Sequence, residues 1–183
     1  MLFFTDPERT PHPERALARL PRGAAIVYRA FGAADAIQVG RRLAIQSRRR
    51  GVLFFVGASV PLAIALRADG LHLPQRMSGR GGDIRRLGRR FIITAAAHAL
   101  PAALDARRSG VNAVVVSSVF PSASPSAGKP IGPRRFATFV RRLDIAVYGL
   151  GGIDARTVSG LGLTGAAGVA AVGGVADDES LQR

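Results

Sequence analysis

The 183-residue chain has no cysteine and no tryptophan. Without cysteine there is no disulfide, no thiolate metal ligand and no thiol nucleophile. The three histidines, His12, His72 and His98, are far apart in the sequence and form no i, i+4 pair. We therefore expect no structural zinc site and no cysteine-based catalysis.

Lysine is nearly absent as well, because Lys129 is the only lysine among 26 basic residues and all the others are arginine. With 12 acidic residues, the formal charge is +14, which in principle suits an anionic partner. The arginines are nevertheless scattered through expected helices, and the aromatic residues, 6% of the chain, do not interleave with them. Arginine, alanine, glycine and proline are abundant together, as in a coding sequence rich in G and C, so we expect no nucleic-acid partner.

No stretch of the sequence predicts a membrane segment. The opening MLFFTDPERTP has no basic n-region, so it predicts no signal peptide. Residues 158–176 carry no charge, but glycines interrupt them and their hydrophobicity is weak. We therefore expect a cytoplasmic protein with no membrane partner.

Eight short apolar runs, separated by segments of helical character, organise the chain. The runs cover residues 1–5, 24–28, 51–56, 70–73, 91–94, 112–120, 145–150 and 165–172. Uniformly apolar strands alternating with helices are typical of a parallel sheet, and eight units favour a closed barrel. The predicted fold class is α/β, a small (β/α)8 TIM barrel in one domain over residues 1–183. Its helices must be minimal, because such barrels typically take about 250 residues, and the last helix is expected only at residues 177–183.

The last two apolar runs are each followed by a pair of glycines, at residues 151–152 and 173–174. Residues 145–153 read IAVYGLGGI and residues 165–174 read GAAGVAAVGG, with a spacer long enough for one brief helix. Glycines at the carboxyl ends of neighbouring parallel strands expose backbone N–H groups to which a phosphate can approach. Glycine also simply turns strands into loops, and the chain has 22 of them. The place of these residues in the last βαβ unit favours a phosphate site.

A series of motifs in a fixed order is similar to the thiamine-phosphate synthases and their relatives, the thiazole tautomerases, which share a small (β/α)8 barrel. The similarity covers nearly the whole chain. The motifs are TDP at 5–7, YR at 28–29, ADGLHLPQ at 68–75, ITAAAH at 93–98, VSSVFPSASP at 116–125, GKPIG at 128–132, GLGGI at 149–153 and GAAGVAAV at 165–172.

The resemblance implies a substrate, a thiazole phosphate, and a reaction that joins it to a pyrimidine methyl pyrophosphate as pyrophosphate leaves. Magnesium is expected to neutralise that leaving group. The resemblance also implies backbone donors for the thiazole phosphate at Gly151 and Gly152, with Val172 and Gly173 completing that site. Ser122 and Ser124 stand at the positions of two threonines, and keep their hydroxyls.

The magnesium and pyrophosphate half of the implied site is largely missing. Of a glutamine, an arginine and a lysine after the second strand, only the arginine is kept, as Arg29. The two metal-binding aspartates fall at Gly57 and at about Met77, so the sequence predicts no metal ligands. A lysine expected in the serine loop is absent, although Lys129 lies in the same loop.

Each candidate residue has a structural alternative. Arg29 is predicted to bind an anion or to form a surface salt bridge, and His98 to act as an acid or base or to be a hydrogen-bonded structural residue. For His72, between two leucines, we favour a core position. Ser122 and Ser124 belong to a loop that fits a substrate lid or a plain polar loop.

Three functions therefore remain open: a thiamine-phosphate synthase, a thiazole tautomerase with a base such as His98 and no magnesium, and a non-catalytic phosphate-binding barrel. The sequence leaves a homodimer open.

Overall fold

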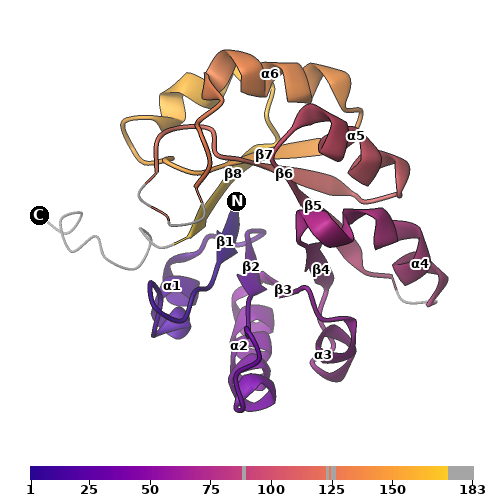
Figure 1. Ribbon diagram of the computed structural model, residues 1–183. Coiled ribbons are helices and arrows are strands. Elements are labelled where there is room, and N and C mark those ends of the chain that lie inside the picture. The colour runs from indigo at the N-terminus through magenta and orange to yellow at the C-terminus, as the bar shows by residue number, and fades with distance from the viewer. Residues whose placement is uncertain (88–89, 123, 125–126, 173–183) are drawn as a thin grey trace, which may run out of the picture.

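A computed structural model describes residues 1–87, 90–122, 124 and 127–172. Eight parallel strands close into a barrel in chain order, and β8 pairs with β1 (Figure 1). The strands are β1 (Leu2–Phe4), β2 (Ala25–Tyr28), β3 (Leu53–Gly57), β4 (Gly70–Leu73), β5 (Ile92–Ala97), β6 (Ala113–Ser117), β7 (Ala146–Leu150) and β8 (Gly168–Val172). The predicted (β/α)8 barrel is therefore confirmed.

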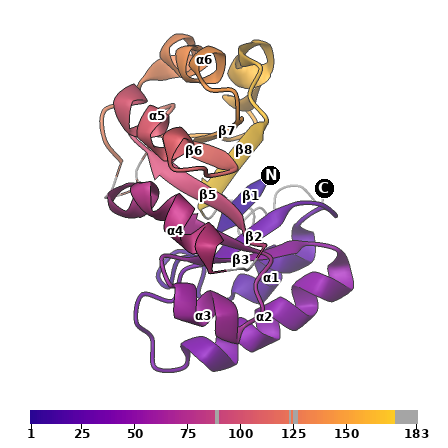
Figure 2. The ribbon, with the colours of Figure 1, turned by 90° about the vertical axis from the view of Figure 1, so that its right-hand side faces the viewer.

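Short helices cover the outside of the barrel (Figures 1 and 2). They are α1 (Pro13–Arg19), α2 (Ala36–Arg50), α3 (Val60–Ala65), α4 (Gly81–Arg86), α5 (Leu100–Arg108) and α6 (Gly132–Arg142), with 3-10 helices η1 (Gln75–Arg80) and η2 (Val158–Thr164). The spacer between β7 and β8, predicted to hold one brief helix, holds η2. The last helix expected at residues 177–183 lies outside the described residues.

Local sequence signals set the ends of these helices. Helix α2 ends at Gly51, whose φ of +67° is a left-handed conformation that glycine adopts without steric cost. Helix α3 begins at Ser59, whose Oγ accepts a hydrogen bond from the Leu62 N–H at 3.3 Å. Such abrupt starts and stops help to fit eight strands and the helices between them into a short chain.

Two apolar layers hold the barrel together. The outer layer lies between strands and helices and includes Phe3, Ile26 and Phe54, all fully buried. The inner layer fills the barrel and consists of Leu2, Phe4, Ala25, Val27, Phe55, Val115 and Ala170. Gly70 belongs to this packing, since a Cβ there would lie 2.6 Å from the Ile92 carbonyl oxygen and 2.5 Å from the nearest atom of the Phe55 ring. The inner layer closes the barrel below the ends of the strands.

His72 lies inside the barrel, in the core position predicted for it. Its Nδ1 is 2.9 Å from Thr94 Oγ1, and its ring meets the Phe4 ring edge to face at 4.7 Å between centroids. Burial, and next the positive charge of Arg29, lower the pKa of His72 to about 3. The imidazole is therefore neutral at physiological pH.

Within the described part of the chain, no helix combines the length and the apolar character that crossing a bilayer requires.

Candidate functional site

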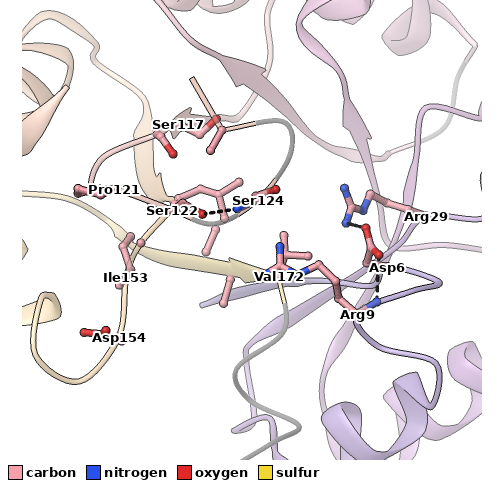
Figure 3. A pocket seen from close by; sticks show the side chains of 17 residues that line it. Asp6, Arg9, Arg29, Ser117, Pro121, Ser122, Ser124, Ile153, Asp154 and Val172 are labelled. Atoms are coloured by element: carbon pink, nitrogen blue, oxygen red, sulfur yellow. Dashed lines mark hydrogen bonds and ion pairs between the residues drawn. The ribbon is translucent and has the colours of Figure 1, made fainter. Parts of the chain in front are cut away.

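A pocket of about 360 Å³ lies at the carboxyl ends of the strands (Figure 3). Its walls come from the loop after β1, the end of β2, the loop after β6, the loop after β7 and the end of β8. Of the residues predicted to bind substrate or phosphate, six line it: Arg29, Ser122, Ser124, Gly151, Gly152 and Val172. The carboxyl ends of barrel strands are the usual place for active sites in this fold.

The glycine loop, Gly151 and Gly152, follows β7 directly. Both residues have positive φ angles, +95° and +64°, and a Cβ at either position would overlap the neighbouring loop, at Ser118 and at Pro121 respectively. Neither N–H group has an acceptor within the described part of the chain. Two N–H groups without a described acceptor therefore belong to residues that line the pocket, and free backbone donors are what an anion site requires.

The turn after the glycine loop holds it in place. Thr157 Oγ1 donates to the Gly152 carbonyl at 2.8 Å, and Asp154 Oδ1 accepts from the backbone N–H groups of Arg156 and Thr157 at 2.8 and 2.9 Å. These hydrogen bonds lower the pKa of Asp154. Although Asp154 lines the pocket, its Oδ1 is engaged by its own turn.

The loop after β6 packs against the glycine loop. The Val119 N–H donates to the Leu150 carbonyl at 2.9 Å, and the Phe120 N–H donates to the Gly151 carbonyl at 3.0 Å. Farther along, the Ser124 N–H donates to Ser122 Oγ at 3.3 Å (Figure 3). Two serine hydroxyls thus line the pocket beside the backbone donors.

Arg29, just after β2, is fixed on several sides. Its Nε donates to the Thr5 carbonyl at 2.6 Å, its NH2 group pairs with Asp6 Oδ2 at 3.0 Å, and its backbone N–H donates to Thr5 Oγ1 at 3.0 Å. The guanidinium carbon also lies 5.8 Å from the Phe4 ring centroid and 5.1 Å from that of Phe31. Arg29 therefore forms the salt bridge considered from the sequence and also lines the pocket.

Arg9 lines the same pocket from the turn after β1. Its backbone N–H donates to Asp6 Oδ1 at 3.1 Å, and its side chain extends toward Val172 (Figure 3). The Arg9 guanidinium forms no ion pair with any described residue. Burial lowers the pKa of Arg29, its ion pair with Asp6 raises it, and the positive charge of Arg9 lowers it further.

His98 and Lys129 do not line the pocket. His98 is exposed, and its Nδ1 lies 3.0 Å from the Ser117 carbonyl oxygen and 3.1 Å from Ser117 Oγ. Ser117 lines the pocket, so His98 is connected to the pocket only by its contact with Ser117. Lys129 is exposed on the loop before α6 and takes no part in the pocket wall, whereas Gly173 lies outside the described residues.

The described residues do not fit a magnesium ion where the resemblance expects one. Gly57 and Met77 offer no side-chain oxygen, and the Asp6 carboxylate already pairs with Arg29. No group of three or more His, Asp or Glu side chains suited to a metal lies within the described ranges. Mg²⁺ prefers oxygen ligands in octahedral geometry, and the residues at these positions do not supply them.

The sequence reasoning missed Asp6, Arg9, Ser117 and Ser118 as pocket residues. A signal was present for the first two, because TDPER directly follows the first strand, and the loops after barrel strands form the site. For the two serines, the expected strand extended to residue 120, whereas β6 ends at Ser117.

Comparisons with known proteins agree with this architecture. Residues 1–175 match the family model described as thiamine monophosphate synthase. A thiamine-phosphate synthase of Pyrococcus horikoshii is 31% identical over 147 residues, which are 80% of this chain and 70% of that protein. One from Roseiflexus sp. is 32% identical over 194 residues, covering 100% of this chain and 82% of the relative.

Among solved structures, a thiamine phosphate pyrophosphorylase from Pyrococcus furiosus superposes with a TM-score of 0.80. The sequences are 27% identical, and the match covers 93% of this chain and 84% of the other. Fold, motif order and sequence similarity thus agree over almost the whole chain, and the chain belongs to the thiamine monophosphate synthase family.

Proposed function

We propose that this protein is a thiamine-phosphate synthase-like protein of thiamine biosynthesis that binds a thiazole phosphate at the carboxyl ends of β7 and β8. The observation that carries the proposal is the glycine loop, in which Gly151 and Gly152 have positive φ angles and N–H groups without described acceptors at the pocket wall. Charge-assisted hydrogen bonds from such groups to phosphate oxygens are strong.

The rest of the pocket suits the remainder of such a ligand. Ser122 and Ser124 offer hydroxyl groups beside the glycine loop, Val172 offers an apolar wall, and Arg29 offers a cation. A pocket of about 360 Å³ falls in the size range of small-molecule sites.

Amide chemical shifts test the proposal directly. We expect titration with thiazole phosphate to shift the ¹H–¹⁵N signals of Gly151 and Gly152 strongly, because a phosphate accepting from an N–H deshields its proton. Gly23 is a matched control, since it also has a positive φ, +80°, but lies outside the pocket. Shifts at Gly23 equal to those at the glycine loop would refute the site.

The reaction itself has two candidates. The synthase reaction joins the thiazole nitrogen to the pyrimidine methylene carbon as the bond to pyrophosphate breaks, and the departing charge must be neutralised. The tautomerase reaction only moves a proton and needs a base. The one observation that bears on this second candidate is the contact between His98 Nδ1 and Ser117 Oγ, because His98 does not itself line the pocket and would act through Ser117.

Turnover assays separate the candidates. The tautomerase reading predicts that His98→Asn lowers isomerase turnover by about a hundredfold, the lower end of general acid–base contributions, with little change in thiazole phosphate affinity. Formation of thiamine phosphate unaffected by the same variant would favour the synthase. Binding with neither activity would leave a non-catalytic phosphate-binding barrel.

A further inference from the structure

The face of the barrel opposite the pocket collects arginine from the ends of the helices. Because all eight strands are parallel, each connecting helix returns the chain to the amino ends of the strands, whereas the pocket lies at their carboxyl ends. Every described α-helix except α3 has arginine in its last turn. These helix-end arginines, all exposed, are Arg19, Arg48, Arg49, Arg50, Arg85, Arg86, Arg107, Arg108, Arg141 and Arg142.

On one side of this face, the end of α2 is joined to both of its neighbours. Arg50 donates to the Ala18 carbonyl of α1, and Arg48 donates to the Arg67 carbonyl just after α3 at 2.8 Å. Both acceptors are neutral oxygens, which hold a guanidinium in place without neutralising its charge. Arg49 lies between these two residues in the sequence and forms no ion pair with any described carboxylate. The end of α2 thus carries three charges, two of them at fixed positions.

The other side of this face joins α4, α5 and α6 in the same way. Arg85 Nε donates to the Gly110 carbonyl, just after α5, at 2.7 Å. Arg107, at the end of α5, pairs with Asp144, just after α6. Neighbouring helix ends are therefore in direct contact, so arginines from different segments of the chain form one surface.

Carboxylates compensate only part of the charge on this surface. The described ion pairs of the helix-end arginines are Arg86 with Asp83, Arg107 with Asp144 and Arg108 with Asp105. Arg85 and the arginines at the ends of α2 and α6 pair with no described carboxylate. A helix dipole corresponds to about half a negative charge at the C-terminus. Two or three arginines at one helix end therefore exceed what the dipole balances.

We propose that the helix-end arginines of α2, α4, α5 and α6 bind duplex DNA through its phosphates and without sequence preference. A planar guanidinium can donate two hydrogen bonds to one phosphate, so arginine suits this contact. The last turns of these helices carry no exposed aromatic or large aliphatic side chain. They therefore offer unpaired bases no stacking surface and a bilayer no apolar anchor, which favours a duplex over a single strand or a membrane.

The fold changes how the sequence is interpreted at this point. The sequence predicted no nucleic-acid partner because its arginines are scattered through the helices. The barrel brings the scattered helix ends to one face, so distance along the chain no longer argues against such a partner. The inference does not depend on the proposed function, since the pocket lies at the other ends of the strands.

The test is a fluorescence anisotropy titration of the full chain with a labelled duplex of about 20 base pairs, in salt from about 50 to about 200 mM. We expect the affinity to fall steeply over this range, because bound phosphates release counterions. Arg141→Gln combined with Arg142→Gln removes two contacts, so the same rise in salt should cost about tenfold less affinity than in the parent protein. Arg134→Gln combined with Arg135→Gln is the matched control, since it removes the same charge from the exposed start of the same helix, and should keep the parent's salt dependence.

A second variant probes the surface on another helix. Arg49→Gln, at the end of α2, should reduce the loss of affinity over the same salt range by about threefold, as expected for one phosphate contact. Absence of duplex binding at the lowest salt would overturn the proposal, and so would equal salt dependence in the two double variants. Tighter binding to a single strand of the same length, or to phosphatidylserine vesicles, would also overturn it, because the partner would then be a different polyanion.

Discussion

Placing a carboxylate in the glycine loop is the most informative single change at this site. In Gly152→Asp, the new side chain starts from a residue with a φ of +64°, next to backbone donors expected to hold a phosphate. At an effective dielectric of about 20, two unit charges about 4 Å apart repel by about 4 kcal/mol. That energy corresponds to about a thousandfold loss of affinity for thiazole phosphate.

The same variant also has a structural cost. A Cβ at residue 152 would lie 2.8 Å from Phe120 Cβ and overlap the Pro121 carbonyl oxygen, so the loop after β6 must shift. The left-handed conformation adds about 1 kcal/mol for a residue other than glycine. Ser122→Asp separates the two effects, because Ser122 lines the pocket without a positive φ, and a carboxylate there repels the phosphate without straining the backbone.

Calorimetry and thermal unfolding together form the assay. We expect both aspartate variants to lose thiazole phosphate binding, Gly152→Asp to unfold at a lower temperature, and Gly23→Asp, where nothing lies within 4 Å of an added Cβ, to bind normally. Unchanged affinity in Gly152→Asp and in Ser122→Asp would refute the phosphate site.

Three further predictions concern neighbouring residues. Gly57→Asp should fold, because the only tight contact of its Cβ is with Cγ of the flexible Arg29 stem at 3.1 Å, and the Tyr28 carbonyl oxygen lies at an ordinary 3.5 Å. It should weaken pyrophosphate in EDTA about tenfold by pairing with the Arg29 guanidinium; unchanged calorimetric affinity would contradict this. Thr157→Val should weaken thiazole phosphate about fivefold, since it removes the 2.8 Å hydrogen bond that fixes the Gly152 carbonyl, whereas Thr157→Ser should bind like the parent protein. The pKa of His72 is about 3 in the folded chain and about 6.5 in the unfolded chain. Between these values only the unfolded chain gains a proton, so the free energy of unfolding decreases as the pH is lowered. Between pH 7 and pH 5 this residue should lower the free energy of unfolding by about 2 kcal/mol, and denaturant titrations of His72→Gln should lack that part of the decrease.

The barrel was predictable because its signals are local and repeated. Each strand is a short apolar run, and several helices carry a start or stop signal, such as Ser59 before α3 and Gly51 after α2. The glycine loop was predictable for the same reason, since only glycine suits the backbone at residues 151 and 152. Local patterns of this kind require no knowledge of distant contacts.

The cationic side of the pocket was harder to predict, because it depends on contacts between distant segments. Arg29 and Asp6 are 23 residues apart and meet only when β1 and β2 pair. His98 was expected in the site because it follows a strand end. In the structure its side chain is exposed and its Nδ1 contacts Ser117, so it lies outside the pocket wall. Likewise, the position of Lys129 in the sequence does not reveal that it lies outside the pocket wall.

We propose that the pocket binds a phosphorylated thiazole through backbone donors and without magnesium. Calorimetric titration of the purified protein with thiazole phosphate, once in EDTA and once in excess magnesium, tests it most directly. We predict the same dissociation constant in both buffers and no binding in Gly152→Asp. Binding that appears only with magnesium, or no binding in either buffer, would contradict the account.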